Sequence, residues 1–217
     1  MTIVTLSREL GSDGADIAQR VAKELGYRLV DKSTFESILR QYGLVKFDDL
    51  YDSAPGFWAR LDNTNLQIIA MLNKTILGIA RLGDVVILGR GGYAALSRYA
   101  DVLHVRIQAP FTLRAERIMA KEGLENIEEA RGIVATNDKA RAAFVQGFYD
   151  ADFHDASHFH LVLDTGVIPV DSAATWITET ARSFEDRSPA AELTAQSVDI
   201  DPILADAIAQ VLEFGHR

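Results

Sequence analysis

The stretch TIVTLSRELGSDGAD, residues 2–16, decides the fold class of this 217-residue chain. Its first five residues, 2–6, are apolar or β-branched, which is typical of a strand buried on both faces. A glycine-containing turn follows, and from Ile17 onward apolar side chains recur every three or four positions until Gly26. This spacing predicts a helix that begins directly after the turn and ends at that glycine. The stretch therefore indicates a buried strand, a tight loop and an immediate helix.

The alternation of strand and helix continues along the chain. Most connections between the apolar runs have helical spacing, so the pattern predicts a three-layer α/β domain with a parallel sheet of about five strands. Further strands are predicted at 27–30, 84–88, 101–107 and 159–163, and further helices from Asp31 to Leu39, at 62–81, 110–121, 126–150 and 171–184.

The predicted domain spans residues 1–185 and carries two additions. One is a helical insertion over about 32–82, which includes an irregular excursion at 43–60, and the other is a helical lid over about 120–150. The acidic segment 186–217 is predicted to be a linker followed by an amphipathic helix that Asp201 caps. The apolar face of this helix is expected to dock on the domain or on a second copy of the chain, which would form a homodimer.

Composition excludes several classes of protein. Lys and Arg number 22 against 31 Asp and Glu, so the net charge is −9 and nonspecific nucleic-acid binding is not expected. The absence of cysteine excludes disulfides, thiolate metal sites and a cysteine nucleophile. No apolar run approaches the roughly 18 residues of a membrane span, and the first residues do not resemble a signal peptide. We therefore expect no membrane partner and a cytoplasmic location.

The turn Gly11-Ser12-Asp13-Gly14 is the first candidate site. A buried strand, a glycine turn and an immediate helix direct backbone N–H groups and a helix dipole at one point, which favours anion binding. The turn differs from the standard phosphate-binding loop G-x-x-x-x-G-K-[ST], because the Lys and the hydroxyl are absent. The alternative is an ordinary tight turn between a strand and a helix.

The loop at 89–92, Gly-Arg-Gly-Gly, is the second candidate site. Its glycines allow a ligand to approach the backbone, and Arg90 can present a bidentate fork to a phosphate. Both loops follow strands, and ligands of open α/β sheets bind at the carboxyl ends of the strands. The alternative is a surface turn with an exposed arginine.

Arginines on the two helices after residue 110 form the third candidate group. Helical spacing places Arg131, Asp138 and Arg141 on one face. Phosphoryl transfer needs positive charge around the migrating group, so arginines on a mobile lid suit it. The alternative is a solvated helix surface with an Asp138–Arg141 ion pair. The arginines concerned are Arg114, Arg117, Arg131 and Arg141.

Other side chains carry weaker signals. Histidines and aspartates gather between 152 and 160, but their spacing matches no standard zinc signature, so no metal site is expected. Phe144, Phe148 and Tyr149 are expected to pack rather than to stack on a base. A G-x-S-x-G motif is absent, which leaves a hydrolase with little support.

The sequence also resembles a known family. Residues 3–18 with 25–27 look like the opening of the cytidylate-kinase-like proteins, which carry S-R-E-[FL]-G-S-G-G at the first loop. The similarity continues in consistent order over residues 2–184, at 31–32, 86–91, 114–118, 137–141 and 159–166.

This resemblance implies a P-loop kinase fold and a nucleoside monophosphate kinase reaction. ATP with Mg²⁺ would donate its γ-phosphoryl group to a pyrimidine nucleotide such as CMP. Arg90 would hold the acceptor phosphate with Asp31 near the acceptor, and Arg117 and Arg141 would clamp the transferring group from the lid, which also carries Arg131 and Asp138. The residues assigned to the donor phosphates are Arg8, Gly11, Ser12, Asp13 and Gly14.

The first loop departs from the family pattern. The family's usual third loop glycine is replaced by Asp13. In an alignment without gaps on true cytidylate kinases, the P-loop Lys falls at Gly14, the Mg²⁺-binding hydroxyl at Asp16 and a lid arginine at Val134. Two carboxylates beside a phosphate cradle repel the ligand unless a metal or Arg8 compensates. Two functions therefore stay open: a kinase with a degenerate P-loop, and a non-catalytic nucleotide-binding or regulatory protein on the same fold.

Overall fold

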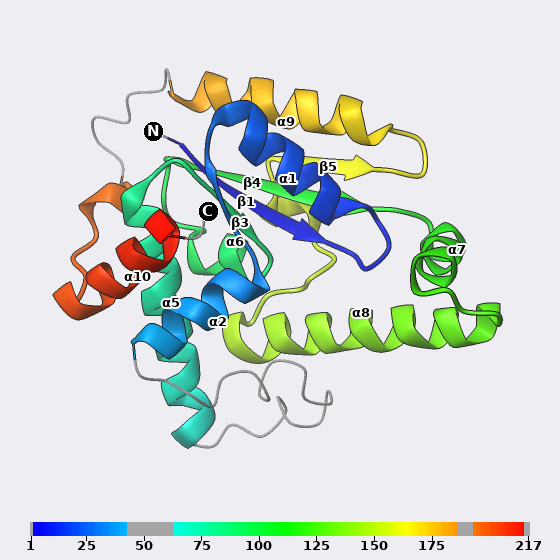
Figure 1. Ribbon diagram of the computed structural model, residues 1–217, viewed down its shortest axis with the longest axis horizontal. Helices are drawn as coiled ribbons and strands as arrows, with labels where there is room; N and C mark the ends of the chain where they lie inside the picture. The colour runs from blue at the N-terminus through cyan, green and yellow to red at the C-terminus, as the bar shows by residue number, and fades with distance from the viewer. Residues whose placement is uncertain (1, 43–62, 186–192, 215–217) are drawn as a thin grey trace.

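The computed structural model describes residues 2–42, 63–185 and 193–214 (Figure 1). The predicted excursion at 43–60 and the first residues of the predicted linker lie outside this part of the chain. None of the described helices is long and apolar enough to cross a membrane.

A five-stranded sheet forms the centre of the domain. All neighbouring strands pair in parallel, in the order β2-β3-β1-β4-β5, which confirms the predicted parallel sheet. Strand β1 lies in the middle because its apolar residues are buried against both neighbours. The strands are β1 (Ile3–Arg8), β2 (Arg28–Val30), β3 (Val85–Leu88), β4 (Val102–Gln108) and β5 (Leu161–Asp164).

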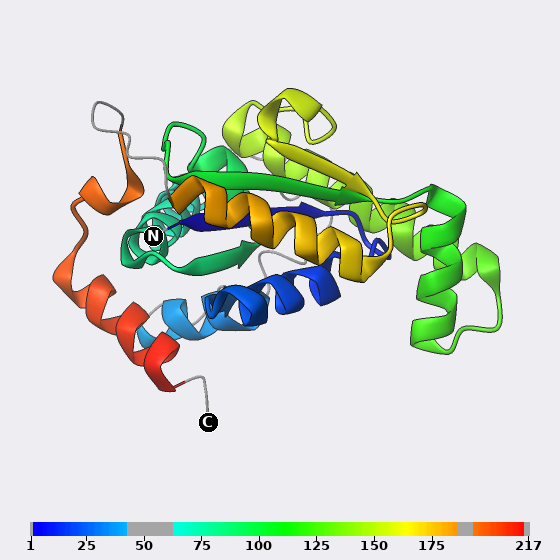
Figure 2. The same cartoon turned by 90° about the horizontal axis from the view of Figure 1, so that it is seen from above.

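Helices cover both faces of the sheet, so the three-layer prediction is also confirmed. On one face, Val4 and Leu6 pack in a cluster with α1 (Gly14–Leu25) and α9 (Val170–Glu185). On the other face, Ile3 belongs to a larger cluster with residues of α2 (Lys32–Gln41), α5 (Asn63–Leu82) and α6 (Gly92–Ala95). Figure 2 shows α1 and α9 together on their side of the sheet.

The predicted lid, about 120–150, contains α8 (Ile127–Tyr149) and only the end of the preceding helix α7 (Phe111–Glu122). They pack on each other through Ala115, Ile118, Ala130 and Val134, which form a small core of their own. Figure 1 shows α7 and the first half of α8 projecting beyond the sheet, whereas the end of α8 lies under it. Phe144 near that end is buried in the main core, as expected for packing.

Strand β5 begins two residues later than predicted. The Asp155 carboxylate accepts a hydrogen bond from the Ser157 amide, which starts a 3-10 turn, η1 (Ala156–His158). This turn takes up the residues immediately before the predicted strand, so the chain becomes extended only afterwards.

The C-terminal helix α10 (Pro202–Phe214) docks on its own domain. Asp201 caps it as predicted, and its apolar face packs between α2 and α5. The contact with α5 is close, since a Cβ on Gly78 would lie 2.6 Å from the Cδ1 of Ile208. Part of the predicted linker is also attached, because the amide of buried Ala195 donates to the Asp101 carboxylate. A homodimer through α10 stays a prediction.

Candidate active site

Both glycine loops lie at the same edge of the sheet. The first loop follows β1 and the second follows β3, and these two strands are neighbours with parallel direction. The Gly89 amide donates to the carbonyl of Leu6 at 3.0 Å, which ties the start of the second loop to the end of β1. The predicted meeting of the two loops at the carboxyl edge is therefore confirmed.

The first loop has the backbone conformation of an anion-binding turn. Gly11 (φ 79°) and Asp13 (φ 57°) are left-handed, and α1 begins at the next residue. Left-handed residues within such a turn curve the chain so that successive N–H groups face one concave side. Gly11 is required for a second reason, since a Cβ there would lie 2.6 Å from the carbonyl oxygen of Arg114.

Ser12 holds this loop in shape. Its side chain is fully buried, and its hydroxyl and its amide both donate to the carbonyl of Glu9, at 2.8 and 3.3 Å. Its own carbonyl accepts the Thr165 hydroxyl at 3.0 Å. The donors left for a phosphate are the amides at the start of α1, because the first N–H groups of a helix have no partner within the helix.

Arg117 neutralises the carboxylate that the sequence analysis placed beside the cradle. It lies 3.0 Å from the Asp13 carboxylate and donates to the carbonyls of Gly11 and Thr165 at 3.2 and 2.9 Å. The compensation for Asp13, which we expected from Arg8 or from a metal, is thus supplied from α7. In this structure Arg117 also ties the first loop to the turn after β5.

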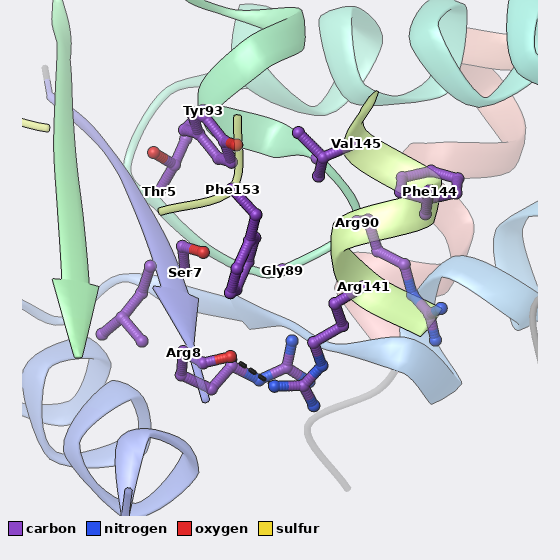
Figure 3. A pocket seen from close by; sticks show the side chains of 12 residues that line it. Thr5, Ser7, Arg8, Gly89, Arg90, Tyr93, Arg141, Phe144, Val145 and Phe153 are labelled. Carbon is purple, nitrogen blue, oxygen red and sulfur yellow. Dashed lines mark hydrogen bonds between the residues drawn. The ribbon is translucent and has the colours of Figure 1, made fainter. Parts of the chain in front are cut away.

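Three of the predicted arginines meet in one pocket. Arg8 lines it from the end of β1, Arg90 from the second loop and Arg141 from α8. Figure 3 shows the guanidinium groups of Arg8 and Arg141 close together, whereas the side chain of Arg90 points away from them. Arg141 donates a hydrogen bond to the carbonyl of Arg8, and Arg90 is 6% exposed with a left-handed backbone (φ 58°). The wall between them is apolar and aromatic, formed by Tyr93, Phe144, Val145 and Phe153.

Several predicted residues do not line this pocket. Of the first loop's residues, Gly11, Ser12, Asp13 and Gly14 are not in its lining, and Arg117 is bound to Asp13 instead. Arg131 forms an exposed pair with Glu128 at 2.7 Å. It is ten residues from Arg141 on α8, a separation of roughly 15 Å along the helix.

A chain of ion pairs behind the loop was missed by the sequence analysis. Glu9 accepts from Arg106 at 3.0 Å and pairs with Arg114 at 3.2 Å. Arg114 in turn makes a bidentate contact with Asp138, at 3.1 and 2.8 Å. These bonds join β1, β4, α7 and α8 in one charged network. One signal was present, since Arg106 interrupts an apolar strand and a buried charge requires a partner.

This network gives Arg114 and Asp138 other partners than the sequence analysis expected. Arg114 was expected among the arginines facing phosphate, but it is 5% exposed and bound to two acids, so it is part of the scaffold. Asp138 was considered as a partner of Arg141 on the helix surface. The ion pair that it forms is with Arg114, across the two lid helices.

Comparison with known proteins identifies the family. The sequence matches the cytidylate kinase-like family over residues 3–167. The chain belongs to this family. It is 29% identical over 174 residues to a cytidylate kinase of Pyrobaculum neutrophilum, covering 80% of this chain and 89% of the relative. A cytidylate kinase of Ignicoccus hospitalis is also 29% identical, over 77% of this chain and 92% of that protein.

A solved structure supports the fold. The crystal structure of an uncharacterized protein from Eubacterium ventriosum superposes with a TM-score of 0.65 at 18% identity, covering 84% of this chain and 99% of the other. Together with the parallel sheet, membership in the cytidylate kinase-like family gives the chain a P-loop kinase fold and makes it a phosphotransferase. The family and the fold support nucleoside monophosphate kinase activity.

Asp31, which the family resemblance placed near the acceptor, caps α2. Its carboxylate accepts bonds from the Thr34 amide at 3.0 Å and from the Ser33 hydroxyl at 2.8 Å. Partial burial alone would raise the pKa of Asp31, but these hydrogen bonds outweigh it and hold the pKa below its usual value. Asp31 does not line the arginine pocket.

The histidines of this kinase-like chain face different partners. The Nδ1 of His154 lies 3.2 Å from Arg106, and that of His160 accepts the His104 amide at 3.0 Å. Within the described ranges, no three metal-binding side chains gather. His104 is buried beside His160, and burial first and its neighbour second lower the pKa of His104 to about 3.

Proposed function

We propose that this protein transfers the γ-phosphoryl group of ATP to a pyrimidine nucleoside monophosphate such as CMP. The observation that carries the proposal is that Arg8, Arg90 and Arg141 all line one pocket at the carboxyl edge of β1 and β3. A chain with a net charge of −9 places three arginines around this pocket, two of them with their guanidinium groups close together in Figure 3, which indicates an anionic ligand. The relatives named cytidylate kinase support the choice of acceptor.

Each part of the site has a proposed role. The donor phosphates bind to the loop Gly11–Gly14, including Ser12 and Asp13, with Arg8 beside it. Arg90 holds the acceptor phosphate, and Asp31 orients the acceptor side through α2. Arg141 and Arg117 approach from α8 and α7 as the lid closes. Arg131 and Asp138 set the position of that lid, Asp138 through its bond to Arg114.

The reaction needs charge stabilisation more than covalent help. An oxygen of the acceptor phosphate forms a bond to the γ-phosphorus while the bond between that phosphorus and the β–γ bridging oxygen breaks, which yields a diphosphate product and ADP. Negative charge spreads over the transferred group during this exchange. Guanidinium groups held in a partly apolar pocket stabilise that charge more strongly than in water.

Mg²⁺ is implied by the family, and the residues present fit it. Mg²⁺ prefers hard oxygen ligands and is usually held by phosphates with one or two carboxylates. Asp16 is exposed in the first turn of α1, so its carboxylate is accessible beside the loop, whereas that of Asp13 is bound by Arg117. Mg²⁺ would neutralise donor charge there, and the Asp16 carboxylate would help to hold it.

The pocket must open to accept a nucleotide. Its volume is about 20 Å³, which is room for a single water molecule. Arg141, Phe144 and Val145 of α8 form one wall, so movement of α8 away from the sheet would enlarge it. Movement of a helical lid on the µs–ms timescale is common among enzymes that exclude water from a reaction.

An activity assay with a full panel of acceptors tests the proposal. Purified protein is mixed with ATP, Mg²⁺ and each nucleoside monophosphate in turn, and ADP formation is followed. We expect ADP to form fastest with CMP or another pyrimidine nucleotide. A rate at background with every acceptor would contradict the proposal. A nucleotide-dependent rise in Tm without turnover would assign the chain the binding or regulatory function instead.

A further inference from the structure

Compared with the standard phosphate-binding loop, the first loop has its cationic residue and one of its glycines at exchanged positions. When the pattern G-x-x-x-x-G-K is placed on residues 8–14, the pattern has glycine at the first position and lysine at the last. This chain has Arg8 at the first position and Gly14 at the last. The loop therefore keeps one long cationic side chain, at its opposite end.

The side chain of Arg8 fills the space that a side chain at position 14 would need. A Cβ on Gly14 would lie 2.5 Å from the Cβ of Arg8 and 3.0 Å from its Cγ. Real Cβ atoms do not approach another carbon so closely, so Gly14 is the residue that admits the stem of Arg8. The glycine and the arginine are sterically complementary.

A second glycine makes room for the other end of the same side chain. A Cβ on Gly89 would contact the Nη1 of Arg8 and would lie 3.2 Å from its Cζ. The guanidinium of Arg8 therefore crosses from the first loop to the second. Figure 3 shows it next to the guanidinium of Arg141 inside the pocket. Two like charges side by side repel, and an anion bound between them relieves that repulsion.

We propose that Arg8 is the catalytic counterpart of the missing P-loop lysine, and that Gly14 and Gly89 are glycines because they accommodate it. This inference rests on the proposed function. As the bond between the γ-phosphorus and the bridging oxygen breaks and the acceptor oxygen bonds to that phosphorus, the Arg8 guanidinium stabilises the charge left on the β-phosphate. Its planar fork contacts two phosphate oxygens, where an ammonium acts as a point charge.

Three variants test the exchange: Arg8→Ala, Gly14→Lys, and a double variant that joins Gly14→Lys to Arg8→Gly. Glycine at position 8 is needed there, because alanine would keep the Cβ that lies 2.5 Å from a Cβ at position 14. Binding of inorganic tripolyphosphate is measured by calorimetry, kcat and KM by ADP formation, and Tm by thermal unfolding. We expect Arg8→Ala to weaken tripolyphosphate binding at least about tenfold and to lower kcat by about 10²–10³-fold. Gly14→Lys alone lowers Tm, because the new side chain meets the stem of Arg8. The double variant regains Tm, tripolyphosphate binding and at least a tenth of the wild-type kcat.

Matched controls separate this role from structural damage. Arg20→Ala removes the same charge from an exposed ion pair on α1 and leaves all three readouts unchanged. Gly89→Ala displaces the guanidinium of Arg8 without changing that residue. Its control is Gly123→Ala, because Gly123 also has a positive φ but no atom lies within 4 Å of the new Cβ. We expect Gly89→Ala to lose tripolyphosphate binding and Gly123→Ala to keep it.

The outcomes distinguish this inference from the proposed function. Tripolyphosphate affinity that is equal in Arg8→Ala and wild type overturns the role of Arg8, even if the wild type is an active kinase. Failure of the double variant to regain binding also overturns it. If the wild type binds tripolyphosphate through Arg8 but phosphorylates no nucleoside monophosphate, the proposed function fails while Arg8 remains the anion-binding cation.

Discussion

Two groups of arginines lie at the same edge of the sheet and differ in what surrounds them. Arg106, Arg114 and Arg117 are bonded to Glu9, Asp138 and Asp13, within the scaffold that connects the loop to the lid. Arg8, Arg90 and Arg141 line the pocket together with aromatic side chains. We call the first group the anchored arginines and the second group the pocket arginines. Residue type and helix face alone therefore do not separate scaffold from site. Arg114 and Arg117 on α7 belong to the first group, whereas Arg141 on the adjacent α8 belongs to the second.

The two groups should respond differently to mutation. A buried ion pair contributes little net stability, but removing one partner leaves an uncompensated buried charge that costs about 3–5 kcal/mol. A side chain that lines a pocket can be lost at little cost in stability while binding or catalysis fails. Changes at Arg106 and Arg114 should therefore lower Tm, and changes among the pocket arginines should lower activity. Changes at Arg117, which also has a proposed role at the transferred group, should lower both.

Loss of Glu9 is expected to have the largest effect on stability. In Glu9→Ala, Arg106 and Arg114 stay buried without the acid that joins them, which costs about 3–5 kcal/mol. For a chain of this size the loss corresponds to a fall in Tm of roughly 6–20 °C, measured by calorimetry. The matched control is Asp171→Ala, which breaks an exposed pair with Arg20 and costs less than about 1 kcal/mol. Equal Tm values for the two variants would show that the anchored network is not structural.

Loss of Arg141 is the corresponding test of the pocket arginines. Arg141→Ala should lower kcat by about 10²–10³-fold, because one donor to the migrating charge is gone. Its Tm should stay within about 2 °C of the wild type. Lys139→Ala, an exposed cation on the same helix, is the control and should keep full activity. A kcat for Arg141→Ala within a factor of two of the wild type would remove Arg141 from the site.

Stability measured as a function of pH tests a buried group that is not an arginine. The arginines stay charged at every pH of the experiment, so they add no pH dependence of their own, whereas His104 does. The pKa of His104 is lowered to about 3 in the folded state against 6.5 for the free side chain. Below pH 6.5 His104 therefore binds a proton in the unfolded chain but stays neutral in the folded chain. The free energy of unfolding consequently falls as pH falls. Between pH 7 and pH 5 this group should cost about 2 kcal/mol. His104→Gln should be less sensitive over that range, and an equal slope in both proteins would refute the assignment.

The cap of α2 is expected to give the smallest effect. Asp31→Ala removes the acceptor for the Thr34 amide and should cost about 1 kcal/mol, or roughly 2–4 °C in Tm. Because the pKa of Asp31 is lowered, its contribution is present above the unfolded value of 3.8 and disappears as pH falls through the folded value. If Asp31 also orients the acceptor, KM for the nucleoside monophosphate rises in Asp31→Ala, whereas Asp31→Asn keeps much of the cap. An unchanged KM would limit Asp31 to the cap.

Local pattern was enough to predict the framework of this protein. Three local patterns predicted the central strand, the loop and α1: the apolar run at 2–6, the glycine turn and the apolar spacing that begins at Ile17. Hydrophobic spacing and turn residues depend on neighbouring positions only, so they can be recognised in the sequence. The predicted helix starts at Asp31 and at 126 agree with the structure, in which Asp31 and Asn126 cap α2 and α8. The position of both loops at one edge followed from parallel strands.

The pairing of side chains was beyond such reasoning. Glu9 and Arg106 are 97 positions apart, and Arg117 reaches an acid on the first loop from 104 positions away, so neither contact leaves a trace in local spacing. For that reason Arg114 stood among the candidate arginines, although its bonds place it in the scaffold. The sequence shows that positions 14 and 89 are glycines, but only the structure shows that the Arg8 side chain occupies the space beside both of them.

A crystal structure of the protein grown with Mg²⁺ and a non-hydrolysable ATP analogue would show whether Arg8 and Arg141 bind the triphosphate. We expect the triphosphate at the start of α1, with the guanidinium groups of Arg8 and Arg141 on its oxygens and α8 shifted to admit it. Density for the analogue away from both glycine loops, with Arg8 and Arg141 positioned as in the unliganded protein, would rule out this binding site.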